Sequence, residues 1–160
     1  MFLCVVGLLG VVAHASIHLP LKLPGHHGLE WMALLMFARV VARSPWAATV
    51  AATSAAGLSY VPVWGFHETT IGLSYLLSGI IVDAGFRLLR TQRAALLACL
   101  AALAHAAKPL WKWAAASGLG VHFGSIEAGV AYALICHLAF GAVGGMAGAL
   151  AGRALLSLRR

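Results

Sequence analysis

Long apolar runs, separated by short polar segments, dominate the chain. None of them shows the strict alternation of a half-buried strand, and their length is typical of helices. Pro20 stops the first run, Pro45 lies at the start of the third and Pro62 at its end, while Pro109 marks a kink or the end of the fifth. We expect six helices, over about 1–18, 28–43, 45–62, 70–89, 93–114 and 126–156.

The composition indicates that these helices lie in a membrane. Of 160 residues, 62% are hydrophobic and 9% are charged, whereas a soluble domain carries roughly 25% charged residues. The chain therefore has too little polar surface to enclose a water-soluble core. We predict an all-α fold: a polytopic membrane protein with six transmembrane helices in a single domain over 1–160. The first run lacks a basic segment before it, so we expect a retained helix and not a cleaved signal peptide.

The arginines give this prediction an orientation. If there are six spans, all the arginines fall on one side of the membrane, and the positive-inside rule makes that side cytoplasmic. They are Arg39, Arg43, Arg87, Arg90, Arg93, Arg153, Arg159 and Arg160. Both termini are then cytoplasmic, in a multi-pass protein of the bacterial inner membrane. The net charge of +7 is explained by this orientation and by lipid contact, so we expect no nucleic-acid partner.

The opposite, outer half receives all eight histidines and three of the four acidic residues. Much of this polarity lies in one stretch, from His14 to Trp31, between the first two helices. The candidate ligand-binding residues are His18, His26, His27, Glu30, Trp64, His67, Glu68, Lys108, His122 and Glu127. Trp64 also fits the aromatic belt that membrane proteins place at their interfaces. The fourth acid, Asp83, precedes Arg87 by four residues, which predicts an ion pair on one helix face.

The histidines allow three kinds of chemistry. His14 and His18 share one helix face, and with His26 and His27 they could ligate a metal ion. His14, His105 and His137 lie at helix depths and could supply axial ligands to haem. The third possibility is a polar vestibule whose imidazoles bond to one another or to water. No catalytic motif or phosphate-binding loop is present, and we predict that the protein is not an enzyme.

Small residues repeat every fourth position in the third run. They are Ala47, Ala51 and Ala55, with Ala48, Ala52 and Ala56 beside them. Such strips let helix backbones approach closely. They could serve packing within the chain, which the pattern alone favours, or docking of another membrane subunit.

Several segments together resemble a known family. Pro20-Leu-Lys-Leu-Pro24 opens a short second helix ending at Arg39. The alanine-rich third helix leaves through Gly57 to Pro62, Leu76-Leu-Ser-Gly-Ile-Ile-Val-Asp83 follows, and a glycine-rich last helix ends in arginines. This layout resembles the substrate-binding S components of energy-coupling factor (ECF) vitamin transporters, loosely the biotin-type branch. The chain is shorter and richer in histidine, and it lacks the glutamine that often follows the proline motif.

The resemblance implies a function and partners. S components have six helices with cytoplasmic termini and bind a vitamin or a metal ion at the outer face. They work with a transmembrane T subunit and two cytoplasmic ATPases, and small-residue helix faces make the T contact. Two alternatives stay open from the sequence: a haem- or metal-binding membrane anchor subunit of an oxidoreductase, and a non-catalytic membrane assembly subunit.

Overall fold

The computed structural model describes residues 1–17, 23–66, 70–120 and 129–159, and the regular secondary structure in these ranges is all helical. The elements are α1 (Phe2–Ser16), α2 (Gly28–Val41), α3 (Ala47–Leu58), the short 3-10 helix η1 (Pro62–Trp64), α4 (Ile71–Leu89), α5 (Ala94–Leu119) and α6 (Val130–Ser157). The prediction of an all-α fold with six α-helices is confirmed for this part of the chain.

Three of these helices are long and apolar enough to cross a membrane, namely α4, α5 and α6. By contrast, α1 and α3 are apolar but have 15 and 12 residues. At 1.5 Å per residue they reach roughly 22 and 18 Å, short of a hydrocarbon core of about 30 Å. The protein is therefore a membrane protein with three clear candidate spans among its described helices.

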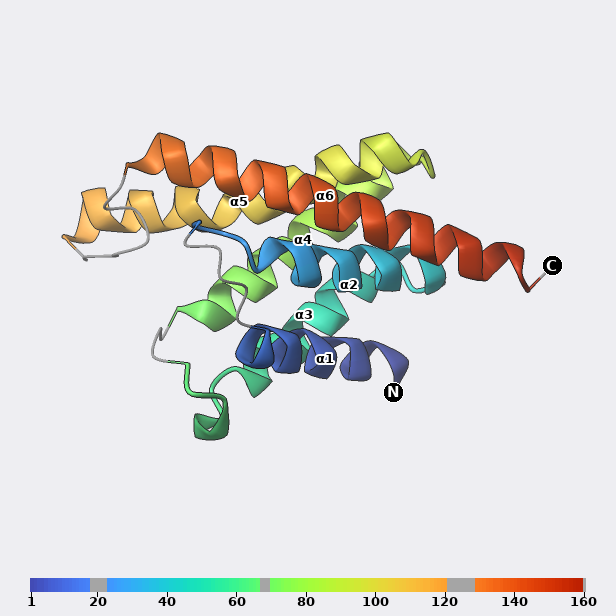
Figure 1. Ribbon diagram of the computed structural model, residues 1–160, viewed down its shortest axis with the longest axis horizontal. Coiled ribbons are helices and arrows are strands. Elements are labelled where there is room, and N and C mark those ends of the chain that lie inside the picture. The colour runs from blue at the N-terminus through green and yellow to red at the C-terminus, as the bar shows by residue number, and fades with distance from the viewer. Residues whose placement is uncertain (18–22, 67–69, 121–128, 160) are drawn as a thin grey trace.

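The six helices form two layers of three (Figure 1). In one layer α2 lies between α6 and α1, and in the other α4 lies between α5 and α3. Helix α2 contacts all five other α-helices, and its Met32, Leu35 and Met36 are fully buried. Both termini lie at the same end of the molecule (Figure 1). This arrangement places α2 at the centre of the core.

Glycines on α6 allow it to lie close against α2. A Cβ at Gly144 would collide with the carbonyl oxygens of Gly28 and Leu29, and one at Gly148 with the carbonyl oxygen of Ala33. The small-residue face of α6 therefore serves backbone-to-backbone packing inside this chain.

The alanine strip of α3 also packs inside the chain. Gly7 of α1 lies against the backbone of Ala51, and Gly79 of α4 lies against Ala48 and Ala52. The fully buried members of the strip are Ala47, Ala48, Ala51, Ala52 and Ala55. Packing within the chain is therefore the role that the structure shows for these five residues, and Ala56 is half-buried.

Helix α5 corrects the expectation that Pro109 could end the fifth helix. Pro109 lies inside it, and the helix continues to Leu119. Proline is tolerated in the interior of membrane helices, where neighbouring groups can satisfy the freed carbonyl. Pro109 is fully buried, so it contributes to the core and does not end the helix.

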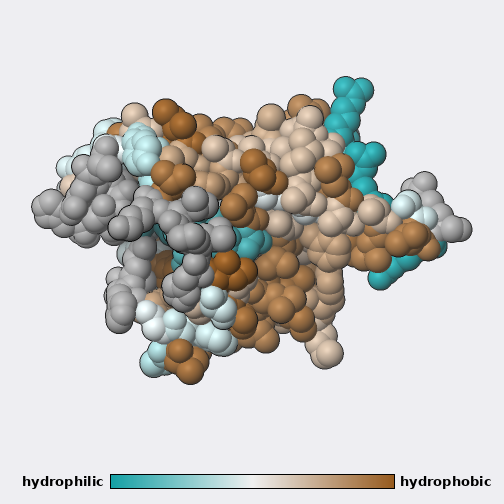
Figure 2. Space-filling view, viewed as in Figure 1, coloured by the Kyte–Doolittle hydropathy of each residue, from teal (hydrophilic) through white to brown (hydrophobic). Residues whose placement is uncertain are grey.

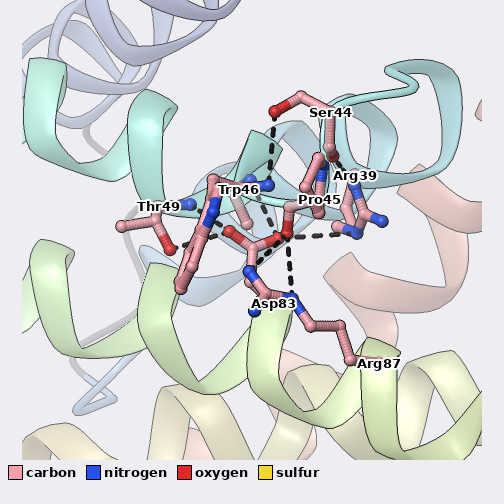
Figure 3. A network of polar contacts seen from close by, with 8 residues as sticks. Arg39, Ser44, Pro45, Trp46, Thr49, Asp83 and Arg87 are labelled. Atoms are coloured by element: carbon pink, nitrogen blue, oxygen red, sulfur yellow. Dashed lines mark hydrogen bonds and ion pairs between the residues drawn. The ribbon is translucent and has the colours of Figure 1, made fainter.

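Asp83 of α4 caps the first turn of α3 (Figure 3). Its carboxylate accepts hydrogen bonds from the backbone N–H of Ala48 at 3.2 Å and of Thr49 at 2.7 Å. The residue at the N-cap position of α3, Trp46, provides no side-chain cap. Since the first N–H groups of a helix have no partner within it, a carboxylate from another helix satisfies two of them.

The arginine beside Asp83 is not the one that the spacing predicted. The Nε of Arg39 lies 3.4 Å from Asp83 Oδ1, and the guanidinium of Arg39 also lies 4.2 Å from the centroid of the Phe86 ring. Arg87 instead donates to the carbonyl oxygen of Pro45 and stacks on Trp46. The predicted Asp83–Arg87 pair is wrong because Asp83 points toward α2 and α3, across the helix interface (Figure 3).

Candidate functional site

A polar cavity of about 30 Å³ lies among α1, α2, α4 and α5. It is lined by His14, His27, Trp31, Ile71, Ser74, Tyr75, Ser78, Ala104, His105 and Lys108. This volume holds roughly two water molecules. In a core that is otherwise apolar, such a concentration of imidazole, hydroxyl, indole and ammonium groups is a candidate binding site.

Each helix brings its polar residues to the cavity by simple spacing. His14 is in the last turn of α1, and His27 occupies the N-cap position of α2. Ser74 and Ser78 of α4 are four residues apart and so share one helix face. His105 and Lys108 are three apart on α5, with the same consequence. Helices, and not loops, therefore hold most of the side chains that line the cavity.

One wall of the cavity is fixed by hydrogen bonds. Tyr75 Oη and His14 Nδ1 are joined at 2.8 Å. The indole N–H of Trp31 donates to Ser78 Oγ at 2.9 Å, and Ser78 in turn donates to the carbonyl oxygen of Tyr75 at 2.7 Å. The rings of Trp31 and Tyr75 meet edge to face, with centroids 4.6 Å apart. These contacts hold α1, α2 and α4 in fixed register around the cavity.

A stack of histidines forms the next part of the lining. The rings of His14 and His27 are nearly parallel, with centroids 3.8 Å apart. His27 Nδ1 lies 2.5 Å from Glu30 Oε1, and the His26 ring lies 4.1 Å from that of His27. Glu30 therefore orients His27 over His14, although Glu30 itself does not line the cavity.

A second pair of histidines supports the segment that precedes α2. The His105 and His137 rings are stacked with centroids 4.7 Å apart. His105 donates from Nε2 to the carbonyl oxygen of Gly25 at 3.0 Å, and His137 donates from Nδ1 to that of Ala133 at 2.7 Å.

Glycine is required where this segment meets the two rings. Gly25 has φ +79°, and a Cβ there would lie 2.6 Å from the His137 ring. A Cβ at Gly28 would collide with the His105 ring. The backbone around the start of α2 therefore packs directly against both imidazole rings, next to the cavity.

The geometry does not fit haem. Two imidazoles that ligate one haem iron stand on opposite faces of the macrocycle, whereas His105 and His137 stack on each other and His14 stacks on His27. A cavity of about 30 Å³ cannot hold a macrocycle. As they are placed here, these three histidines do not form a haem site, and the haem-binding alternative stays an untested prediction.

The metal prediction receives no support from the part of the chain that is described. There, no three His, Cys, Asp or Glu side chains form a group that could hold a metal ion. His14, His26 and His27 do lie together, but they stack ring on ring. The fourth predicted ligand, His18, lies outside the described residues.

The predicted ligand-binding residues divide into three groups. His27 and Lys108 line the cavity, while His26 and Glu30 contact His27 beside it. Trp64 of η1 is half-buried against the hydrophobic core and does not line the cavity. The predictions that lie outside the described residues are His18, His67, Glu68, His122 and Glu127.

Sequence reasoning missed four polar lining residues. From the sequence, Trp31 marks only the end of the polar stretch, and no motif distinguishes Ser74, Tyr75 and Ser78. The last three are polar residues within one and a half turns of the apolar helix α4. That pattern, a polar patch on a membrane helix, is the signal that could have found them.

Comparison of this chain with protein-family models, with curated proteins and with solved structures gives no match. The fold and the cavity themselves define the class: an α-helical membrane protein with a buried, histidine-rich polar cavity near one end.

Proposed function

We propose that this protein is the substrate-capture membrane component of an ECF-type uptake transporter, and that it is not an enzyme. The observation that carries the proposal is the buried polar cavity lined by His14, His27, Tyr75, His105 and Lys108. It lies among the helix ends opposite to the arginine-bearing end. A protein that binds a ligand from outside needs its site in the outer half, and the arginine distribution supports that orientation for this cavity.

The proposed topology has six spans, with both termini in the cytoplasm of a bacterial inner membrane. Two observations support it. Both termini lie at one end of the molecule (Figure 1), as an even number of crossings requires. Arg43 follows α2, Arg90 follows α4 and Arg159 follows α6, so the arginines recur after every second helix. The shorter helices α1 and α3 would cross where the bilayer thins around the protein, which is how a membrane accommodates a helix shorter than its hydrocarbon core.

The cavity lining favours the polar group of a vitamin-like molecule over a metal ion. Among the described residues, no carboxylate lines the cavity, while Lys108 contributes an ammonium group. Ammonium disfavours a bound cation and favours an acceptor or an anion. The volume of about 30 Å³ suits a group of a few atoms. The remainder of a larger ligand would have to displace the segment around Gly25.

The proposed energy source lies in partner subunits. The sequence contains no phosphate-binding loop, so transport would need a transmembrane T subunit and cytoplasmic ATPases. Because α1 and α4 cover the alanine strip of α3, the T subunit would dock on other surfaces of the helices.

The proposal is tested by purifying the tagged protein from its native host in mild detergent and identifying what accompanies it by mass spectrometry. Recovery of a T-type membrane subunit with ATPases supports it, and recovery of redox subunits overturns it. The same preparation is analysed for retained small molecules. A compound held by the wild type and by Tyr132→Phe, an exposed tyrosine on α6, but lost from Tyr75→Phe would support the cavity as its site.

A further inference from the structure

The arginine-bearing end of the molecule carries a strong positive charge. Figure 2 shows hydrophilic side chains gathered at the end where the C-terminus lies. The exposed arginines there are Arg43, Arg87, Arg90, Arg93, Arg153 and Arg159. Among the described residues Asp83 is the acidic residue near them, and it is fully buried and bonded to α3. This end therefore has an uncompensated positive field.

A hollow of about 430 Å³ opens within this positive end. It is lined by Gln92 from the connection between α4 and α5, and by Arg153, Leu156 and Ser157 from the last turns of α6. An amide, a guanidinium and a hydroxyl thus face one space from two elements. Guanidinium groups bind phosphate oxygens with paired hydrogen bonds.

The start of α5 adds to the attraction for an anion. Gln92 lies two residues before Ala94, the first residue of α5. The first turn of this helix contains no acidic residue, and Arg93 at the N-cap position provides no side-chain cap. The N-terminus of a long helix carries a partial positive charge and N–H groups without partners in the helix. The guanidinium in the hollow and the start of α5 next to Gln92 therefore both favour an anion at this end of the molecule.

Large apolar side chains stand at the same end. Leu88 is 84% exposed at the end of α4, and Leu158 is 85% exposed just after α6. In a soluble protein such exposure is unfavourable, but acyl chains would cover both residues in a membrane. A guanidinium and an apolar side chain in one hollow, with exposed leucines at the same end of the molecule, match the two-part chemistry of a phospholipid.

We propose that the hollow formed by Gln92, Arg153, Leu156 and Ser157 binds the phosphate headgroup of an anionic phospholipid of the cytoplasmic leaflet. Arg153 meets the phosphate, Gln92 donates to it, and Leu88 and Leu158 contact the acyl chains. The exposed leucines favour a lipid over free phosphate. This site is at the opposite end from the histidine-lined cavity, and it rests on the topology proposed above but not on the transport function.

The test uses the full chain in nanodiscs that contain equal amounts of phosphatidylglycerol and phosphatidylcholine, followed by native mass spectrometry of the released protein. The wild type is expected to retain phosphatidylglycerol preferentially. Arg153→Gln is expected to lower that retention about ten-fold, the loss expected for a specific hydrogen bond between charged groups. Gln92→Ala provides a second, neutral variant with a smaller expected loss.

The matched control is Arg43→Gln, which removes the same charge from an exposed arginine outside the hollow. It is expected to retain phosphatidylglycerol as the wild type does. Equal losses in Arg43→Gln and Arg153→Gln would overturn the proposal, because the attraction would then be diffuse. Displacement of the lipid by millimolar inorganic phosphate would also overturn it, since the site would then take free phosphate. Unchanged unfolding midpoints in all variants show that the comparison is between folded proteins.

Discussion

Thr49 is bonded twice to Asp83: its backbone N–H and its hydroxyl each donate to Asp83 Oδ2 at 2.7 Å. The two residues belong to neighbouring helices, and the carboxylate is fully buried. The pair therefore acts as a helix cap supplied from outside the helix that it caps.

Asp83→Asn is expected to destabilise the protein by about 3 kcal/mol. The change keeps the shape of the side chain but removes the charge that faces Arg39 and the first turn of α3. The measurement is thermal unfolding in detergent. Arg87→Gln is the control and should cost much less, because Arg87 contacts Pro45 and Trp46. A comparable loss in the control would mean that Asp83 depends on Arg87 after all.

Gly148→Ala is expected to lower the unfolding midpoint strongly, because its Cβ would collide with the backbone of Ala33 and separate α6 from α2. A rigid backbone contact cannot yield as a side chain can, and overpacking of this kind costs about 1–3 kcal/mol. Gly57→Ala is the matched control in α3, since a Cβ there meets nothing. It should be neutral or stabilise by up to about 1 kcal/mol. Equal midpoints for the two variants would contradict the close packing of α6 on α2.

Gly25→Ala is expected to disturb the cavity as well as the backbone. Gly25 and Gly65 both have positive φ, +79° and +67°, but only Gly25 lies against a histidine ring. Alanine at either position carries the cost of a left-handed conformation, about 1 kcal/mol. Gly25→Ala should lose further stability and should release a compound that Gly65→Ala retains. Unfolding midpoints and mass spectrometry of retained small molecules measure both effects, and identical behaviour of the two variants would contradict the prediction.

Ser78→Ala is expected to destabilise the protein by about 1–3 kcal/mol, because it leaves the buried indole N–H of Trp31 without its acceptor. Replacing both partners, with Trp31→Phe and Ser78→Ala together, should recover part of the hydrogen-bond penalty. Unfolding of the two single variants and the double variant forms a thermodynamic cycle. Additive losses would show that the bond contributes little.

The sequence predicted the positions of the helices better than the contacts between their side chains. Apolar runs bounded by Pro20, Pro45 and Pro62 were enough to predict six helices, since helix formation in an apolar chain is largely local. Side-chain partners depend on which faces meet. Asp83 has Arg87 on its own helix, yet it turns to Arg39 and α3, and no spacing along one helix could reveal that choice.

The candidate site was predicted only in part for the same reason. His27 and Lys108 were named because they are polar residues in an outer segment. Tyr75 and Ser78 were not named, because an isolated hydroxyl in an apolar helix can be recognised as part of a site only when its contacts are known. Here those contacts come from Trp31 and His14 on other helices. The alanine strip of α3 shows the converse: its spacing predicted close packing correctly but could not identify the neighbour.

The capping of α3 by Asp83 has a consequence for the way in which the protein is made. Helix α3 is synthesised before Asp83, and until Asp83 has also left the ribosome its first turn lacks this acceptor. An exposed N–H group costs several kcal/mol in hydrocarbon, and a helix of 12 residues is marginal by itself. We therefore expect α3 to become stable in the bilayer only when α4 arrives, so that the two helices enter the membrane together as one hairpin.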